Sequence, residues 1–366
     1  MNFLIGILSS AIAATVVLLI PWVGVGVLHL YTLFGVVIPY LAILIFLVGM
    51  ILRVLDWGRS PVPFRIPTTA GQQWSSLPMV KHSWIENPKD TKGVIVRMAL
   101  EVLCFRSLFR NVRLEYRRIE NLPKIAFEWE KWLWMAAIVF HYSFLIIFLR
   151  HFRFFTNPIP CFVKLLERLD GFFQAGVLPI PGLTIPEVYI TDLLLLLSVT
   201  YLLVRRLYIP QVRYVSLPSD YFPLFLILGI GTSGVLMRYF IRVDITKVKE
   251  LAFGLFKFHP HVPDGIGTIF FIHLFFVCTL IAYIPFSKIC HMAGIFLSPT
   301  RNLSNNTRFK RHVNPWDNKP AWEYPGMVHT YEEYEEEFRD LMIEAGIPVE
   351  KMPEKKEEEK TEQTEE

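Results

Sequence analysis

Two stretches of this chain decide its fold: residues 132–155, WLWMAAIVFHYSFLIIFLRHFRFF, and residues 266–292, IGTIFFIHLFFVCTLIAYIPFSKICHM. Each contains the run of about 20 mostly apolar residues that a helix needs to cross a bilayer. The first carries His141 and His151, and the second carries His273 and His291. Ionisable side chains inside spanning helices are costly, so they indicate a function. The two stretches therefore predict two membrane helices with functional histidines.

The composition of the whole chain also indicates a membrane protein. Hydrophobic residues make up 53% of the 366 residues and charged residues only 19%, whereas a soluble domain has about 25% charged residues. The net charge of +4 is too small for a phosphate-binding footprint, which argues against nucleic acid as a partner. The four cysteines form no CxxC or CxxCH motif, which argues against zinc ribbons, cysteine-ligated iron–sulfur centres and c-type haem. We predict an all-α, multi-pass protein of the cell membrane.

About six spans follow from the apolar stretches and the prolines and arginines that bound them. Pro21 is expected to stop the first span, Pro39 to bend the second, and Arg53 to close it. Because Met1 and Asn2 bring no positive charge, we expect a retained anchor helix rather than a signal peptide. The predicted spans are Phe3–Ile20, Val23–Leu52, Trp132–Phe155, Val188–Val204, Tyr221–Ile241 and Ile266–Ile289.

Lysine and arginine in the loops predict the orientation, because basic loops stay in the cytoplasm. This puts the arginine-rich segment 53–131 and the C-terminus inside. Residues 94–118 alternate apolar and basic positions at helical spacing, which predicts either an interfacial helix on anionic lipid or a docking surface for a soluble partner. The expected parts are N-terminal helices (1–52), the basic loop (53–131), the histidine-bearing domain (132–292), a cytoplasmic segment (293–350) with an acidic helix over 331–345, and a disordered charged tail (351–366).

The four histidines fall at two depths if the two helices pack antiparallel. His141 then meets His291 near the inner surface, and His151 meets His273 near the outer surface. At roughly 1.5 Å per residue the spacings are about 15 Å and 27 Å, so helix tilt has to absorb the difference. Two stacked pairs of neutral imidazoles are what two six-coordinate haems b need.

A single membrane histidine is often a plain helix–helix hydrogen-bond donor. We interpret His29 in the second span as structural, and His259 and His261 as loop residues, with metal binding or proton gating as their alternative.

These histidine spacings resemble the gamma subunit of respiratory nitrate reductase, a di-haem b quinol oxidase, over roughly residues 127–299. The chain departs from that subunit in four features, and in these it is more similar to the DsrM family, called HmeC in archaea. The features are the extra N-terminal span, the long basic loop, the expanded loop 243–265 and the longer tail. That family is the membrane cytochrome of the sulfite-reduction-associated Dsr complex, a heterodisulfide reductase (Hdr)-like menaquinol-oxidising assembly.

The resemblance implies electron transfer from menaquinol through two haems b to a cytoplasmic Hdr-like iron–sulfur subunit of the DsrK type. The final acceptor would be a disulfide or trisulfide of the DsrC protein in dissimilatory sulfur metabolism (sulfate respiration). Other membrane and periplasmic Dsr subunits are the further partners. Matched position by position, His141 and His291 would hold the cytoplasmic-side haem, and His151 and His273 the outer haem.

The quinol site is expected beside the outer haem. Small residues in the fifth span, Gly229–Gly234, allow a flat ring to approach the backbone. Arg238 and Arg242 near the outer end are candidates for a quinone oxygen or haem propionates, or they mark the helix end. Asp192 is a candidate proton acceptor, or a helix-start carboxylate.

Three alternatives remain open at this point. A proton-coupled transporter with a histidine relay predicts inverted repeats and broken helices, which the sequence does not show clearly. A non-catalytic anchor uses its histidines only to join helices. Finally, the same two haems reduce quinone instead of oxidising quinol if their potentials are reversed.

Overall fold

A computed structural model describes residues 3–60, 83–119, 122–171, 189–304, 331–346 and 349. The chain divides into two units, 1–309 and 310–366, which are considered separately. In the second unit α14 (Tyr331–Glu344) forms where the sequence predicts a short acidic helix. The tail expected to be disordered, 351–366, lies outside the described residues.

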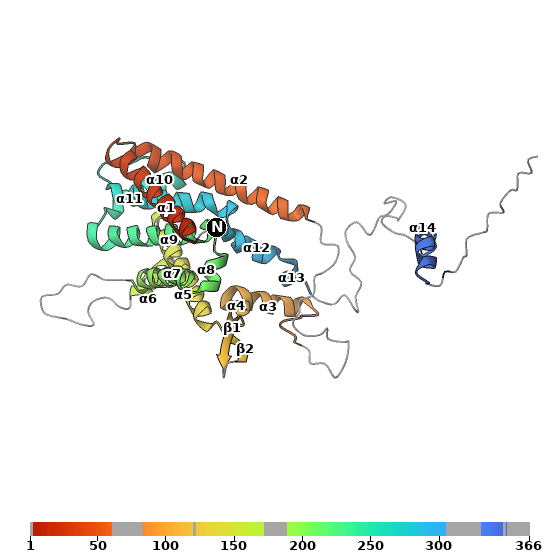
Figure 1. Cartoon of the computed structure of the whole chain (residues 1–366). Coiled ribbons are helices and arrows are strands. Elements are labelled where there is room, and N and C mark those ends of the chain that lie inside the picture. Colours follow the sequence, from red (N-terminus) through yellow and green to blue (C-terminus); the bar gives the residue numbers. More distant parts are fainter. Residues whose placement is uncertain are drawn as a thin grey trace, which may run out of the picture. The chain divides into compact units, whose positions relative to one another are not determined.

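Within the described part of the first unit, five helical segments are long and apolar enough to cross a membrane. The fourth predicted span, Val188–Val204, corresponds to α7 (Ile190–Tyr208), whose 19 residues extend for about 28 Å and which packs between α5 and α9 (Figure 1). Asp192, Arg205 and Arg206 make it more polar than the other five. The fold is therefore the predicted helical membrane bundle. The five segments are α1 (Phe3–Gly26), η1 (Leu33–Val37) with α2 (Ile38–Arg59), α5 (Lys131–His151) with η2 (Phe152–Phe154), α9 (Pro218–Val235) with η4 (Leu236–Ile241), and α11 (Thr268–Tyr283) with η5 (Ile284–Phe286).

α11 contacts α1, α2 and α9, and it supplies the centre of the packing. Phe271 of α11 and Leu226 of α9 are fully buried, and each belongs to a separate cluster of apolar side chains. By contrast, α1 and α2 expose large apolar residues along their outer faces. A helix that is apolar on all sides suits lipid on one side and protein on the other.

The connection between the first two segments differs from the prediction. α1 continues through Pro21 to Gly26 instead of stopping at Ile20. In a membrane, a proline is tolerated because neighbouring groups satisfy the one carbonyl that it frees. The backbone turns at His29, whose φ is 55°, so His29 lies in a loop and not within the second span. The second span is regular only from Ile38 and extends beyond Arg53 to Arg59.

Pro39 marks a change of helix type. The five residues of η1 form a π-helical turn, and Pro39 occupies the first turn of α2 that follows it. Proline has no N–H to donate to the preceding turn, and a wider turn accommodates the missing hydrogen bond. At the position of the predicted bend the structure thus has a π-helical turn followed by a regular α-helix.

The basic segment is only partly helical, which corrects the predicted helix over 94–118. Asp90 caps α3 (Thr91–Cys104) by accepting a hydrogen bond from the Gly93 N–H at 2.8 Å. Phe105, at φ 50°, ends α3, and the single turn α4 (Arg106–Phe109) follows. The chain then forms an antiparallel hairpin from β1 (Val112–Ile119) and β2 (Leu122–Trp129). Strict alternation of apolar and polar residues is the signal for a strand that helical spacing obscured.

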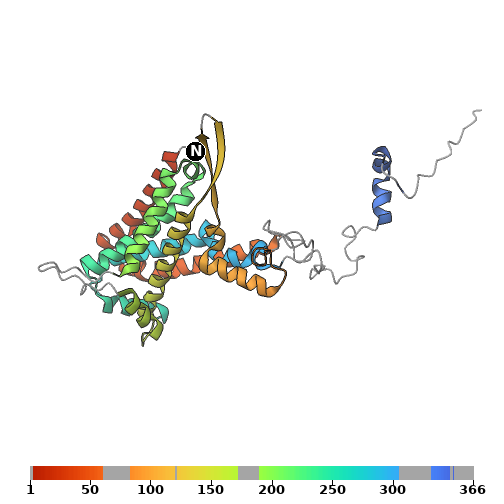
Figure 2. The same ribbon diagram turned by 90° about the horizontal axis from the view of Figure 1, so that it is seen from below.

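The sixth predicted span is also broken. α11 ends at Tyr283, and Pro285 begins two 3₁₀ turns, η5 and η6 (Lys288–Cys290). His291 starts the next helix, α12 (His291–Leu297), which leads to α13 (Pro299–Asn302). The chain from His273 to His291 is thus not one helix, and the predicted 27 Å rise does not apply to it. The surface helices α6 (Cys161–Asp170), α8 (Pro210–Val215) and α10 (Ile245–Phe256) complete the unit (Figure 2).

Candidate functional site

The inner histidine pair joins α5 to the start of α12. The ring centres of His141 and His291 lie 6.2 Å apart, with their planes at 80°. His141 Nδ1 donates to the Ala137 carbonyl at 2.7 Å, and His291 Nδ1 donates to the Lys288 carbonyl at 3.0 Å. A carbonyl only accepts, so each Nδ1 carries the proton. Each ring therefore keeps the lone pair on Nε2.

The outer pair joins α5 to α11. The ring centres of His151 and His273 lie 6.5 Å apart, and the rings are nearly parallel, at 10°. His151 Nδ1 donates to the Ile147 carbonyl at 2.7 Å, in the same way that His141 donates to the carbonyl four residues before it. His273 Nδ1 lies 3.0 Å from Ser233 Oγ, which itself donates to the Gly229 carbonyl at 2.6 Å. The serine oxygen is thus left to accept from His273.

All four histidines share one arrangement that suits a metal between the two rings of each pair. An anchored Nδ1–H fixes the tautomer and the ring direction and leaves Nε2 as a ligand. Two imidazoles that share a metal at a metal–nitrogen distance of about 2 Å have ring centres about 6 to 6.5 Å apart. Among the described residues, no group of three or more His, Cys, Asp or Glu side chains is placed to hold a metal ion. Two protein ligands suffice for haem, because the macrocycle supplies four nitrogens of its own, so each pair fits haem b.

Asp192, the candidate proton acceptor, lies in a buried ionic network beside the outer pair. The buried guanidinium of Arg150, next to His151 in sequence, pairs with Asp192 at 2.6 Å and with Asp170 at 2.9 Å. Tyr239 donates its hydroxyl to the other Asp192 oxygen at 2.7 Å. The Asp192 carboxylate is therefore held between a cation and a phenol rather than free.

The sequence interpretation missed three members of this network. Arg150 lies in the last turn of α5, and Asp170 ends α6, in a segment between predicted spans that carries no motif. Asp170 also accepts from both the backbone N–H and the hydroxyl of Thr191, at 3.0 and 2.6 Å, which ties α6 to the start of α7. A charge inside an otherwise apolar stretch was the signal for Arg150, because a buried cation needs a partner. Nothing in the sequence marked Tyr239 as the third member.

Arg238 is placed by an aromatic ring rather than by an acid. The Tyr189 ring lies between two guanidinium groups, with Arg238 at 3.9 Å and Arg150 at 4.0 Å from its centre. Stacking on an aromatic face positions a guanidinium and leaves its N–H groups available. Arg242 is the residue that follows η4, and its φ is 53°. Its side chain is exposed and takes part in none of the contacts just described. The structure thus groups Arg238 with Asp192 around Tyr189 and Tyr239.

The other three histidines that the structure describes, His29, His259 and His261, lie in connections between helices. His29 stacks on Tyr31, with ring centres 6.0 Å apart, in the loop between α1 and η1. His259 and His261 follow the end of α10 and are both exposed. Within the described residues, none of these three histidines faces another histidine ring as the members of the two pairs do.

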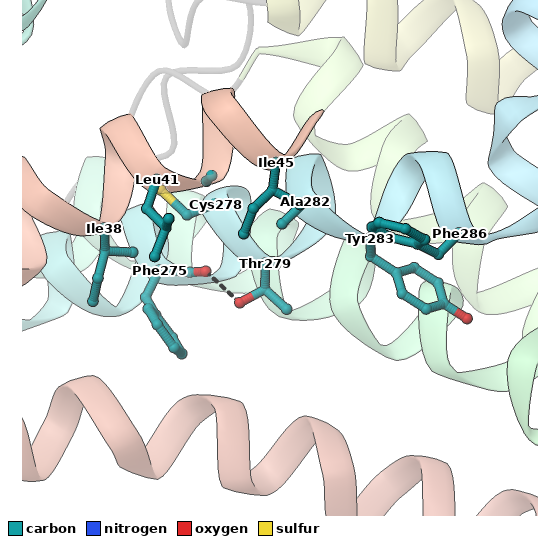
Figure 3. A pocket seen from close by; sticks show the side chains of 10 residues that line it. Ile38, Leu41, Ile45, Phe275, Cys278, Thr279, Ala282, Tyr283 and Phe286 are labelled. Atoms are coloured by element: carbon teal, nitrogen blue, oxygen red, sulfur yellow. Dashed lines mark hydrogen bonds between the residues drawn. The ribbon is translucent and has the colours of Figure 1, made fainter. Parts of the chain in front are cut away.

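A separate apolar groove runs between α2 and α11 (Figure 3). Its volume is about 360 Å³. Thr279 is one of its few polar side chains, and its hydroxyl already donates to the Phe275 carbonyl at 2.8 Å. The groove holds none of the predicted site residues.

Comparison with known proteins places this architecture. Residues 99–307 match the nitrate reductase gamma subunit family. The Hdr-like menaquinol oxidoreductase cytochrome b-like subunit of Archaeoglobus profundus is 44% identical over 289 residues, which cover 77% of this chain and 82% of that protein. The protein of the same description from Archaeoglobus fulgidus is 41% identical over 292 residues, 78% of this chain and 83% of that one.

A more distant relative is one of the subunits of the dihydromethanophenazine:CoB–CoM heterodisulfide reductase of Methanosarcina thermophila. It is 25% identical over 266 residues, which cover 73% of this chain and 90% of that protein. The extent and identity of the Archaeoglobus matches, together with the bundle and its paired histidines, assign the chain to the family of Hdr-like menaquinol oxidoreductase cytochrome b-like subunits, within the nitrate reductase gamma subunit family.

Proposed function

We propose that this chain is the membrane cytochrome b of a menaquinol-oxidising complex, with one haem b between His141 and His291 and a second between His151 and His273. The single observation that carries the proposal is the shared arrangement of the four rings. The ring centres lie 6.2 Å apart in the inner pair and 6.5 Å apart in the outer pair. Every Nδ1 is hydrogen-bonded, so that Nε2 remains available as a ligand. Haem b, when bound, supplies one-electron redox chemistry.

The protein holds these ligands in place and sets their separation. His141 and His151 are ten residues apart on α5, so the two sites differ in depth by about 15 Å. Phe105 and Phe140 present ring edges to His141, with ring centres at 4.9 and 5.0 Å. These rigid apolar contacts limit the movement of the imidazole and keep water from it.

We propose that quinol is oxidised on the outer side, where the network around Asp192 adjoins His151. In that role Tyr239 Oη passes its proton to Asp192 Oδ2 and takes one from the quinol, and the Arg150 pairing holds the carboxylate in position. Arg238, stacked on Tyr189, directs N–H groups to a quinone oxygen or a propionate. Arg242 is the second candidate for a propionate partner.

We further propose that electrons leave from the inner pair to a cytoplasmic Hdr-like iron–sulfur subunit, in a Dsr-type complex of dissimilatory sulfur metabolism. The names of the Archaeoglobus relatives support an Hdr-like assembly. The inner pair lies where α12 begins, and α3, α12 and α13 gather at that end of the bundle. With the basic segments inside, this end and the C-terminus face the cytoplasm.

A reduced-minus-oxidised spectrum tests the proposal. The purified chain is expected to show low-spin haem b absorbance under dithionite, and a redox titration of that absorbance is expected to resolve two components. His273→Ala should remove the outer component and leave the inner one, and His29→Ala, a histidine outside both pairs, should retain both. Folded protein without haem absorbance would refute the cytochrome function, and two intact components in His273→Ala would refute the ligand assignment.

A further inference from the structure

The hairpin β1–β2 has two faces of opposite character. Alternate residues of a strand point to opposite faces, and the register sets Val112 opposite Trp129, Leu114 opposite Phe127, and Tyr116 opposite Ile125. One face is therefore apolar over these three pairs, up to Arg118 opposite Pro123 near the tip. The other face carries Arg113, which pairs with Glu115 and with Glu128, both at 2.6 Å.

The apolar face is exposed in the isolated chain. Its six side chains are 46% (Trp129) to 71% (Phe127) accessible, and β1 and β2 contact each other far more than any other element. In Figure 2 the hairpin projects from the helices at the end of the bundle where α5 begins. An isolated two-stranded hairpin is marginal in water, and a contiguous apolar face of this kind marks an interaction surface.

Contacts at the base of the hairpin place the start of the apolar face beside α5. Phe109 lies between Trp129 of the hairpin and Trp134 in the first turn of α5, with ring centres at 4.7 and 4.8 Å. Trp134 also donates to the Cys104 carbonyl at 2.8 Å, and Tyr142, further along α5, donates to the Leu103 carbonyl at 2.9 Å. The segment before the hairpin thus lies along the first turns of a membrane-spanning helix. The apolar face begins at Trp129, which Phe109 holds beside the first turn of α5.

The composition of the hairpin selects lipid as the occupant. Tyr116 and Trp129 on the apolar face, and Trp132 at the start of α5, are the residue types that collect at the membrane–water interface. Lys124 on β2 adds an exposed basic residue, and basic residues are attracted to the anionic lipids of the cytoplasmic leaflet.

We infer that the hairpin Val112–Trp129 is a membrane-interface anchor, which lays its apolar face into the leaflet at which α5 begins. The anchor would fix the depth of the inner end of α5. The inference does not depend on the redox function proposed above.

Site-specific fluorescence quenching tests the anchor in the full chain. Cys104→Ser and Cys161→Ser remove the two exposed thiols, and a bimane label is then attached at Phe127→Cys or, as the matched control on the opposite face, at Glu128→Cys. Each protein is placed in vesicles of phosphatidylglycerol and phosphatidylcholine that contain a nitroxide-labelled lipid. The label at 127 is expected to lose most of its emission and the label at 128 little of it. Leu114→Cys and Arg113→Cys repeat the comparison on the other strand.

Two outcomes would overturn the anchor. Equal quenching at 127 and 128 would show that the apolar face does not enter lipid. The label at 127 could also remain unquenched in vesicles and become shielded from solvent only in membranes that contain the whole complex. That result would assign the face to a partner protein instead.

Discussion

Ser233 distinguishes His273 from the other three paired histidines, which donate to backbone carbonyls. A side-chain acceptor can be removed by mutation, whereas a carbonyl cannot. Ser233→Ala leaves the His273 Nδ1–H without this acceptor, so the imidazole becomes less basic and less well oriented. We expect the midpoint potential of the proposed outer haem to rise and its retention to weaken by roughly 10- to 100-fold.

Ser198→Ala is the matched control, because Ser198 is a buried helical serine that donates only to the Leu195 carbonyl. A redox titration of both variants measures the effect. An outer-haem potential that moves equally in the two variants would show that the contact with His273 has no special role.

Arg150 differs from its neighbour Arg153 in burial. The Arg150 side chain is 9% exposed and pairs with two acids, whereas the Arg153 side chain is 30% exposed and pairs with Glu167 alone. Arg150→Ala leaves Asp170 and Asp192 as uncompensated buried charges, so we expect a loss of about 3 kcal/mol in the free energy of unfolding. Arg153→Ala should cost less than about 1 kcal/mol. Thermal unfolding in detergent measures both, and equal losses would contradict the ionic role of Arg150.

Single residues were predictable from sequence where an energetic penalty marked them. His141, His151, His273 and His291 stand out because polar groups are rare in apolar spans. Tyr189 and Tyr239 did not stand out, because a tyrosine near the end of a span is ordinary. Their role depends on α7 and η4 coming together, which no local pattern encodes.

At the scale of elements, the contact between α2 and η5 depends on one glycine. A Cβ on Gly49 would lie 2.8 Å from the Cβ of Pro285, whereas a Cβ on Gly58, further along α2, would meet nothing within 4 Å. Gly49→Ala should therefore destabilise the protein by about 1 to 3 kcal/mol through overpacking. Gly58→Ala should be neutral or stabilising by up to about 1 kcal/mol, because alanine favours the helix. Melting temperatures that fall equally in both variants would show that helix propensity, not the close approach, governs α2.

Elements were predictable where a long apolar run leaves the backbone no choice other than a helix. α5, α9 and α11 form where hydropathy places them. The hairpin was missed because Val112, Leu114 and Tyr116 fit both a strand and a loosely amphipathic helix. The break after Tyr283 was missed because the apolar run continues past Pro285, although proline removes a helical donor there.

At the scale of the whole molecule, Arg97 joins segments 204 residues apart in sequence. Its guanidinium is buried and donates to the carbonyls of Arg301, Leu303 and Glu86. Burial, and then the nearby Arg301 cation, lower the pKa of Arg97 from its ordinary value. An arginine stays charged in spite of such a shift, because its ordinary pKa is so high. One cation thus holds α3 against α13, next to the helix that begins at His291.

Removing this cation should release α13 from α3. A hydrogen bond to a charged group contributes about 1.5 to 3 kcal/mol. Losing even one of the bonds from Arg97 should therefore raise the population in which residues 298–304 are locally unfolded by roughly 10- to 100-fold. We expect Arg97→Ala to speed tryptic cleavage after Arg301 by that factor, measured as the rate at which the fragment ending there appears in the mass spectrum. Arg110→Ala is the control, because Arg110 is half exposed and pairs with Glu86 without contacting α13 in the described residues. If the two variants are cleaved at the same rate, the α3–α13 contact is held by something other than the buried arginine.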